Sequence, residues 1–310
     1  MTPQQHHTPV SRSPFWAGLL SVVATGLGHI YCGRIEKGLI LFFISLAFSP
    51  IIASSIAANA SSISLFTLIG ALLVLAFVFF YAIVDAVIIA KDQRSGYMLK
   101  EYNRWYIYLA VIIVSFTYPT NLANTIRDHV VQAYKIVGDS MTPSILKGDC
   151  ILINKMVYKK QSPRSGDVVV FVNPNKRHMD YIKRIVALPG DSVEIRENIL
   201  YINDFPLVYR PVADSAATEL PPGVTGAPMI EKNGPVAYGI MHTGKVNPST
   251  DMNRTIVPNG FCFVLGDNRN DSEDSRSFGP VPLADIKGRV DYIYLPAASW
   301  SRFGPYENLK

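Results

Sequence analysis

Residues 63–90 read ISLFTLIGALLVLAFVFFYAIVDAVIIA, which is the longest apolar stretch in the N-terminal part of the chain. Asp85 is the single charged side chain of this stretch. The stretch is longer than the roughly 20 apolar residues that a helix needs to cross the hydrocarbon core of a bilayer. Such length and lack of charge favour a transmembrane helix over a buried helix of a soluble protein. The stretch therefore predicts a protein that resides in a lipid bilayer.

Two neighbouring stretches repeat this pattern. Residues 39–57 and 105–123 are mostly apolar, and the second begins with aromatic residues of the kind that favour the membrane interface. A shorter apolar stretch, 15–31, is interrupted by three glycines and is compatible with an interfacial helix, a re-entrant segment or a fourth span. We therefore predict a membrane region over residues 1–123 with about three transmembrane helices, at 39–57, 63–90 and 105–123.

Charged residues in the connecting loops predict the orientation of these helices. The turn at Arg34 and Lys37 is basic and residues 59–62 carry no charge. The segment 91–104 is also basic, with Lys91, Arg94, Lys100 and Arg104. Because basic loops stay in the cytoplasm, we expect a multi-pass protein of the cell inner or plasma membrane. Everything after about residue 124 then lies on the extracytoplasmic (periplasmic) face. This placement accounts for the net charge of +5 without nucleic-acid binding.

The remainder of the chain, 124–310, has the pattern of a β-rich domain. Apolar runs of strand length occupy 150–154, 167–172 and 261–265, and residues 192–203 read as a hairpin. Regularly spaced short strands predict a mostly-β domain of antiparallel sheets, arranged as a sandwich or a barrel. Residues 209–255 are rich in Pro, Gly, Thr and Asn, and we expect an insertion of loops with room for one hairpin.

Three cysteines, Cys32, Cys150 and Cys262, are too few for a disulfide framework. None belongs to a Cys-x-x-Cys pair, which argues against a zinc or redox site. Cys150 and Cys262 both fall in apolar runs, and two alternatives stay open for them: a bridge, or two buried thiols.

Two residues are a candidate nucleophile and its base. Ser140 lies in the turn Gly138-Asp139-Ser140-Met141-Thr142-Pro143, where glycine and proline restrict the backbone around a small hydroxyl. A serine needs an adjacent base to act as a nucleophile, and no histidine of the sequence lies in a motif that would supply one. Lys183, in the strand-like run 181–186, can be that base if burial lowers its pKa. Read alone, both features are also compatible with a structural serine and a lysine that reaches solvent.

A dense polar cluster, residues 266–279, follows the apolar run 261–265. It contains Asp267, Asn268, Ser272, Asp274 and Arg276. Such a cluster is either a solvated loop or a salt-bridged support for a site.

Together these segments resemble the type I signal peptidases. The nucleophile box of that family, Ser-Met-x-Pro followed by Gly-Asp, is here Ser140-Met141-Thr142-Pro143 and Gly148-Asp149. A second box is Gly166-Asp167 with apolar residues after it, and the box of the base is Tyr181-Ile182-Lys183-Arg184-Ile185. The polar cluster 266–279 is the last box. The boxes follow the family's order and cover about residues 136–296.

The resemblance implies a membrane-anchored serine endopeptidase that removes signal peptides from exported preproteins after small residues at the −1 and −3 positions. It implies Ser140 as nucleophile, Lys183 as general base and Ser272 as the hydroxyl that orients the lysine amine. The residues implied to support the site are Arg184, Asp267, Asn268, Asp274 and Arg276. Those implied to form the nucleophile turn or to bind substrate are Gly138, Asp139, Met141, Pro143 and Tyr181. No metal and no organic cofactor is implied.

The resemblance also concerns the oxyanion hole, which would use the backbone N–H of Ser140. Some family members add a hydroxyl two residues before the nucleophile, and this sequence has Gly138 at that position. Position 138 therefore offers no side-chain donor to the oxyanion.

Three other functions are alternatives. A soluble protein with a Ser-Lys pair should lack the apolar stretches between residues 39 and 123. A penicillin-binding enzyme would need Ser-x-x-Lys, and position 143 is proline. The remaining alternative is a non-catalytic membrane protein that binds signal peptides, or a degenerate subunit of a pair.

Overall fold

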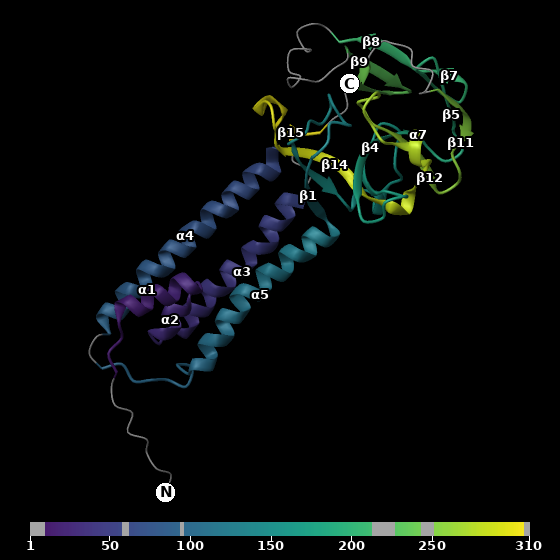
Figure 1. The fold of residues 1–310 in the computed structure, drawn as a ribbon. Coiled ribbons are helices and arrows are strands. Elements are labelled where there is room, and N and C mark those ends of the chain that lie inside the picture. The colour runs from purple at the N-terminus through teal and green to yellow at the C-terminus, as the bar shows by residue number, and fades with distance from the viewer. Residues whose placement is uncertain (1–9, 58–61, 94–95, 213–226, 243–250, 307–310) are drawn as a thin grey trace. The chain divides into compact units, whose positions relative to one another are not determined.

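The computed structural model describes residues 10–57, 62–93, 96–212, 227–242 and 251–306, and the chain divides into two units, Met1–Asp128 and His129–Lys310. The first unit is helical (Figure 1). Its helices are α1 (Pro14–Val23), α2 (Leu27–Tyr31), α3 (Ile35–Ala57), α4 (Ser62–Asp92) and α5 (Trp105–His129). The uncharged loop at 58–61, and Arg94 in the basic segment, lie outside the described residues.

Helices α3, α4 and α5 are each long and apolar enough to cross a membrane. The predicted number of three apolar helices is confirmed. The last of them, α5, continues to His129, beyond the expected end at residue 123. Helix α5 continues because its polar last turns, after Pro119, contain no glycine or proline to end it. An apolar stretch predicts the span and not the end of the helix.

Residues 15–31 form two helices of 10 and 5 residues. At about 1.5 Å per residue neither crosses a hydrocarbon core of about 30 Å. The chain turns between them at Gly26, whose φ is +88° and where an added Cβ would lie 2.1 Å from the Gly38 carbonyl oxygen. Only glycine fits there, so the interrupted pattern in the sequence reflects tight packing of α2 on α3.

Asp85 of α4 joins three helices. Its Oδ2 lies 2.7 Å from Nε2 of His29 in α2 and 2.7 Å from Nζ of Lys37 in α3. A carboxylate inside a membrane segment is costly unless it is paired. The cluster therefore ties α2, α3 and α4 together.

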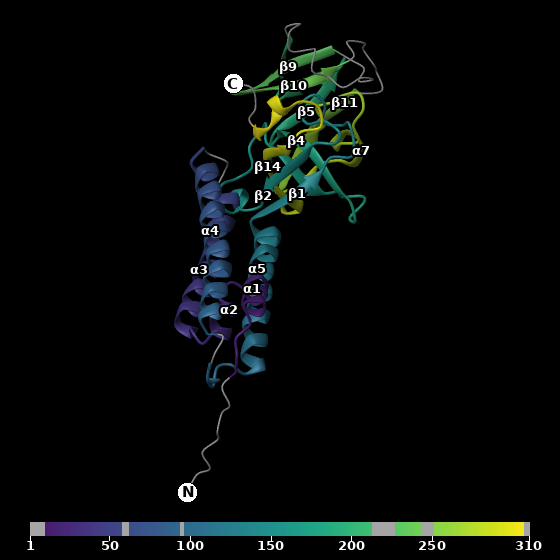
Figure 2. The same cartoon turned by 90° about the vertical axis from the view of Figure 1, so that its left-hand side faces the viewer.

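The second unit is built of antiparallel strands (Figure 2). An 8-stranded sheet has the order β1-β2-β14-β3-β4-β12-β13, with β15 paired to β14. Its strands are β1 (Val131–Lys135), β2 (Cys150–Asn154), β3 (Val168–Val172), β4 (Asp180–Ala187), β12 (Phe261–Leu265), β13 (Val281–Pro282), β14 (Ile286–Leu295) and β15 (Gly304–Pro305). The α-helices that the structure describes wholly within this unit, α6 (Val157–Lys160) and α7 (Ser275–Phe278), have four residues each. The predicted mostly-β domain is confirmed.

Two smaller sheets complete the unit. One has the order β11-β5-β6-β7, with β5 (Ser192–Arg196), β6 (Ile199–Ile202), β7 (Phe205–Pro206) and β11 (Met252–Ile256). The predicted hairpin over 192–203 is its β5–β6 pair, which turns at Glu197 and Asn198 with positive φ at both. The other sheet, β10-β9-β8, belongs to the predicted insertion: β8 (Val208–Pro211), β9 (Ala227–Asn233) and β10 (Val236–His242). Residues 213–226 and 243–250 of the insertion lie outside the described residues.

Strand β3 explains why some strands read as continuous apolar runs. Val168 and Val170 pack in one buried cluster, with Ile151 and Ile153, whereas Val169 and Phe171 pack in another, with Ile185 and Cys262. A strand covered on both faces has no polar side.

The structure decides between a disulfide bridge and two buried thiols for Cys150 and Cys262. Cys150 and Cys262 are buried free thiols. Cys150 is on β2 and Cys262 on β12, with β14, β3 and β4 between them. Neighbouring strands are about 4.8 Å apart, so the two cysteines are separated by far more than a disulfide spans.

Candidate active site

The loop after β1 and the strand β4 bring Ser140 and Lys183 together. The Nζ atom of Lys183 lies 2.6 Å from Oγ of Ser140. Lys183 is only 3% exposed, and its Nζ is 5.6 Å from the centre of the Tyr181 ring. A serine hydroxyl within hydrogen-bond distance of a buried amine is the arrangement that nucleophilic catalysis requires.

Burial lowers the pKa of Lys183 to about 8, since the ammonium loses its hydration. The carboxylates of Asp274, Asp267 and Glu273 act in the opposite direction and limit the shift. A lysine with this pKa is neutral in a substantial fraction of molecules near neutral or mildly alkaline pH, and the neutral amine can accept a proton.

The first residues of the polar cluster hold the nucleophile turn. The backbone N–H of Asn268 donates to the Ser140 carbonyl at 3.0 Å, and its Nδ2 donates to the Asp139 carbonyl at 3.2 Å. Gly266 packs against the same turn, because an added Cβ would lie 2.5 Å from the Ser140 carbonyl oxygen and 2.1 Å from Oγ of Ser272. The close approach of the two loops therefore requires glycine at 266.

Ser272 is brought to the site but makes no hydrogen bond to Lys183 in the described structure. Its Oγ is buried and lies near the Asp274 carboxylate, whose pKa it helps to lower. Its closeness to the Gly266 position places it beside the nucleophile turn. Its role as the group that orients the amine stays a prediction.

Arg184 follows Lys183 and points into the core, where it pairs with Asp267. Both side chains are fully buried, and Nε and Nη2 of Arg184 contact the two carboxylate oxygens at 2.7 and 2.6 Å. Its remaining donors reach the Gly166 carbonyl, at 2.8 Å, and the Tyr306 hydroxyl, at 2.7 Å. Buried charges are stable only when paired and hydrogen-bonded in this way, so the pair fixes β4 against the polar cluster.

A second ion pair joins Asp274 and Arg276. Nε and Nη2 of Arg276 each lie 2.8 Å from an oxygen of Asp274, and the Gly266 N–H donates to the same carboxylate at 3.0 Å. Burial alone would raise the pKa of Asp274, but these hydrogen bonds and the Arg276 charge outweigh it and lower the pKa. The carboxylate stays ionised and anchors both ends of the loop 266–274.

A cavity of about 480 Å³ opens beside Ser140 and Lys183. Residues 134–140 line one side of it and residues 179–183 the other, with Val170, Asp271 and Glu273. Of the predicted turn and substrate-binding residues, Gly138, Asp139 and Tyr181 line this cavity. Met141 does not, since it is fully buried in a core cluster. Pro143 does not line it either and packs near Gly239 of β10.

Several residues that support the site were missed by the sequence reasoning. Glu231 of β9 forms a buried ion pair with Arg269, 2.6 Å long, and the Tyr238 ring stacks on Arg184, with its centre 4.1 Å from the guanidinium carbon. Tyr306 binds Arg184, and Glu273 accepts a 2.7 Å hydrogen bond from Tyr181. The one signal in the sequence was Gly234-Pro235, the two-residue turn that joins Asn233 to Val236 in the β9–β10 hairpin. In the described part of the chain, no three His, Cys, Asp or Glu side chains are placed to hold a metal.

The sequence of this chain is similar to those of known proteins. A sequence model of the family described as signal peptidase, peptidase S26, matches residues 105–295. Signal peptidase I of Bacillus caldolyticus is 35% identical over 198 residues, which cover 64% of this chain and 92% of that protein. Signal peptidase IB of Staphylococcus aureus (strain N315) is 32% identical over 219 residues, which cover 69% of this chain and 100% of that protein.

A crystal structure of a signal peptidase I from Enterococcus faecalis V583 is 30% identical, covers 42% of this chain and 97% of its own, and superposes with a TM-score of 0.26. The family assignment rests on the sequence matches, because the family model spans more than half of the chain and the chain covers nearly the whole length of both relatives. The chain therefore belongs to the signal peptidase family, peptidase S26.

Proposed function

We propose that this protein is a membrane-anchored signal peptidase I, a serine endopeptidase that removes N-terminal signal peptides from exported preproteins. Ser140 is the nucleophile and Lys183 the general base. The observation that carries the proposal is the 2.6 Å distance between Lys183 Nζ and Ser140 Oγ at the wall of an open cavity.

In the first half of the reaction, Oγ of Ser140 attacks the scissile carbonyl carbon and its proton passes to Nζ of Lys183. The backbone N–H of Ser140 faces the developing oxyanion and stabilises it. When the tetrahedral intermediate collapses, the C–N bond breaks and the new amino terminus takes the proton from the Lys183 ammonium. The signal peptide remains as an ester on Ser140.

In the second half, the neutral amine of Lys183 takes a proton from water, and the hydroxide so formed attacks the ester. The C–O bond to Ser140 breaks, and its Oγ recovers the proton from Lys183. The products are the signal peptide with a free carboxylate and the enzyme in its starting state. Every proton transfer uses the one lysine, so no metal and no cofactor enters the scheme.

Two strand edges support an extended substrate. Among the described strands, β1 pairs only with β2, and β12 pairs with residues 184–187 of β4, which leaves one edge of residues 180–183 without a strand partner. These two edges flank the cavity. A peptide in extended conformation can pair with both through its backbone. Small residues at −1 and −3, on the same face of such a peptide, are the substrate preference that the family resemblance implies.

The membrane topology follows from the charge of the loops. With the basic residues at Arg34 and Lys37 and in 91–104 in the cytoplasm, a chain with three spans carries the peptidase unit on the extracytoplasmic face of the cell inner or plasma membrane. Signal peptides of exported proteins are accessible there.

Cleavage of a preprotein tests the proposal. Full-length protein in detergent, incubated with a preprotein, should give one product whose new N-terminus is found by mass spectrometry. Ser140→Ala and Lys183→Ala should each lose at least about 10³-fold in rate while remaining folded, and the double variant should lose little more, since the two residues act as one unit.

A Lys183→Ala enzyme within tenfold of wild type would contradict the mechanism. Binding of the signal peptide without any cleavage would instead support the alternative, a non-catalytic signal-peptide-binding protein or a degenerate subunit.

A further inference from the structure

The hairpin β9–β10 of the insertion carries a buried carboxylate that the proposed chemistry does not use. Glu231 of β9 has no exposed surface, and Arg269 faces it with a side chain that is 9% exposed. The two carboxylate oxygens lie 2.6 and 2.7 Å from Nη1 and Nη2 of Arg269. The hydroxyl of Tyr238, on β10, donates to the same carboxylate at 2.7 Å. Such a complete set of partners fixes the guanidinium in one place.

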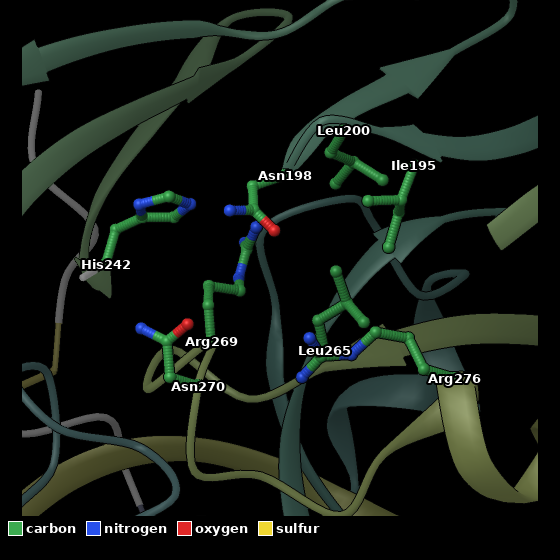
Figure 3. Close-up of a pocket in the computed structure, with 8 residues that line it drawn as sticks. All are labelled: Ile195, Asn198, Leu200, His242, Leu265, Arg269, Asn270 and Arg276. Carbon is green, nitrogen blue, oxygen red and sulfur yellow. The ribbon is translucent and has the colours of Figure 1, made fainter. Parts of the chain in front are cut away.

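Arg269 in turn closes the loop that begins at Gly266. Its Nε donates to the Gly266 carbonyl at 3.1 Å, and its backbone N–H donates to the Met241 carbonyl at 3.1 Å. The backbone N–H of Met241 donates a 2.8 Å hydrogen bond to the Asp267 carbonyl of the same loop. Figure 3 shows the guanidinium end of Arg269 directed toward Asn198 and His242, with Leu265 and Arg276 on the other side of a small cavity. The β9–β10 hairpin therefore holds the loop by one side chain and two backbone bonds.

The same loop holds the nucleophile. Asn268, which lies between Asp267 and Arg269, donates its backbone N–H to the Ser140 carbonyl and its Nδ2 to the Asp139 carbonyl. A continuous chain of contacts thus leads from Glu231 through Arg269 and Asn268 to Ser140. None of these contacts involves Lys183.

We propose that Glu231 is a positioning residue for Ser140, acting through Arg269 and the loop 266–269. The inference rests on the proposed peptidase activity and assigns a role to the insertion. Glu231 neither touches the reacting atoms nor lines the cavity beside Ser140, so its loss should slow the chemical step and leave substrate binding unchanged.

Glu231→Gln tests this in the full-length protein, because glutamine keeps the shape and removes the charge that holds Arg269. We expect kcat for preprotein cleavage, per folded molecule, to fall about 10- to 100-fold, since small misplacements of reacting groups have effects of this size. KM should stay within about twofold. Glu194→Gln is the matched control: Glu194 is in a half-exposed pair with Arg196, 3.0 Å long, and should leave kcat unchanged.

A second variant separates positioning from mere folding. Replacing the buried pair by apolar residues, Glu231→Leu with Arg269→Met, removes two buried charges together, and such exchanges are often neutral for stability or stabilising. We expect the Tm of this double variant to lie close to that of wild type while kcat is low, because no Nε at position 269 closes the loop at Gly266.

The results distinguish the inference from the function on which it rests. An active wild type with kcat within twofold of normal in both Glu231 variants would overturn the positioning role alone, as would a large rise in KM at unchanged kcat. A wild-type protein that cleaves no preprotein would overturn the proposed function and this inference with it.

Discussion

The amine of Lys183 lies 2.6 Å from the hydroxyl of Ser140 on a side chain that is almost fully buried. Only the neutral amine accepts the serine proton, so activity should rise with pH through the folded-state pKa of about 8. The measurement is kcat/KM for preprotein cleavage from about pH 6 to pH 10. A midpoint near 6.5, the usual value for histidine, would exclude Lys183 as the base.

Stability gives an independent test of the same lysine. Its pKa falls from 10.5 to about 8 on folding, so below pH 8 the ammonium must be held in a dry site, at a cost of roughly 3 kcal/mol. Between about pH 8 and pH 10.5 the unfolded chain still binds the lysine proton that the folded chain has released. Rising pH therefore favours the folded state in this range, and the penalty fades. Lys183→Met keeps the apolar stem and should be inactive yet at least as stable as wild type at pH 7.

The advantage of Lys183→Met should shrink as the pH rises through this window. Thermal unfolding of both proteins at pH 7 and pH 9.5 measures it. A Met variant that is strongly destabilised at pH 7 would mean that the lysine is held by favourable contacts of its charged form.

The buried pair Arg184–Asp267 should be essential to the fold of the peptidase unit. Asp267→Ala leaves the guanidinium of Arg184 without its counter-charge and should cost about 3–5 kcal/mol in the free energy of unfolding. Arg254→Ala removes a pair in which both side chains are more than half exposed and should cost less than about 1 kcal/mol. Urea unfolding of the two variants gives the comparison, and similar costs would contradict the importance assigned to burial.

The strands and the helices could be predicted because their signals are local. The length of the apolar runs marks β2, β3 and β12, and the polar pair Glu197-Asn198 marks the β5–β6 turn, all within a few residues of sequence. The sequence boxes around Ser140 and Lys183 could also be recognised within a few residues of sequence. The end of α5 was missed because polarity stops the membrane signal without stopping the helix.

The support of the site could not be predicted in the same way. Arg184 meets Asp267 over 83 residues of sequence and Tyr306 over 122, and Glu231 lies in a segment that reads as an ordinary polar loop. Whether such a charged residue is buried depends on which strands become neighbours. The same holds for Cys150 and Cys262, whose distance is set by the strand order β2-β14-β3-β4-β12.

The proposed topology predicts which engineered cysteines are accessible from outside the cell. Asn259 is exposed in the turn before β12, and Glu101 is exposed in the loop between α4 and α5. The three native cysteines are buried, so a maleimide that cannot cross the bilayer should report on the engineered site. In intact cells it should label Asn259→Cys, and Glu101→Cys only after permeabilisation. The reverse pattern would overturn the orientation and the access to exported substrates.

The absence of a side chain at Gly266 should be necessary for the rate of preprotein cleavage, because neighbouring atoms fill the space that a Cβ would occupy. An added Cβ would lie 2.1 Å from Oγ of Ser272 and 2.5 Å from the Ser140 carbonyl oxygen, both closer than atoms in contact allow. Gly266→Ala must therefore push the polar loop away from the nucleophile turn, with the Asn268 N–H that binds the Ser140 carbonyl. We expect kcat to fall by about 100-fold.

The matched control is Gly70→Ala, in α4, where an added Cβ meets no described atom within 4 Å. Alanine in a helix is more stable than glycine by about 0.5–1 kcal/mol, so this variant should be as active as wild type and no less stable. Rates are compared per folded molecule, since Gly266→Ala also strains the fold. If Gly266→Ala retained kcat within threefold of wild type, the loop would have to move without moving Ser140, and the contacts of Asn268 would then not be what positions the nucleophile.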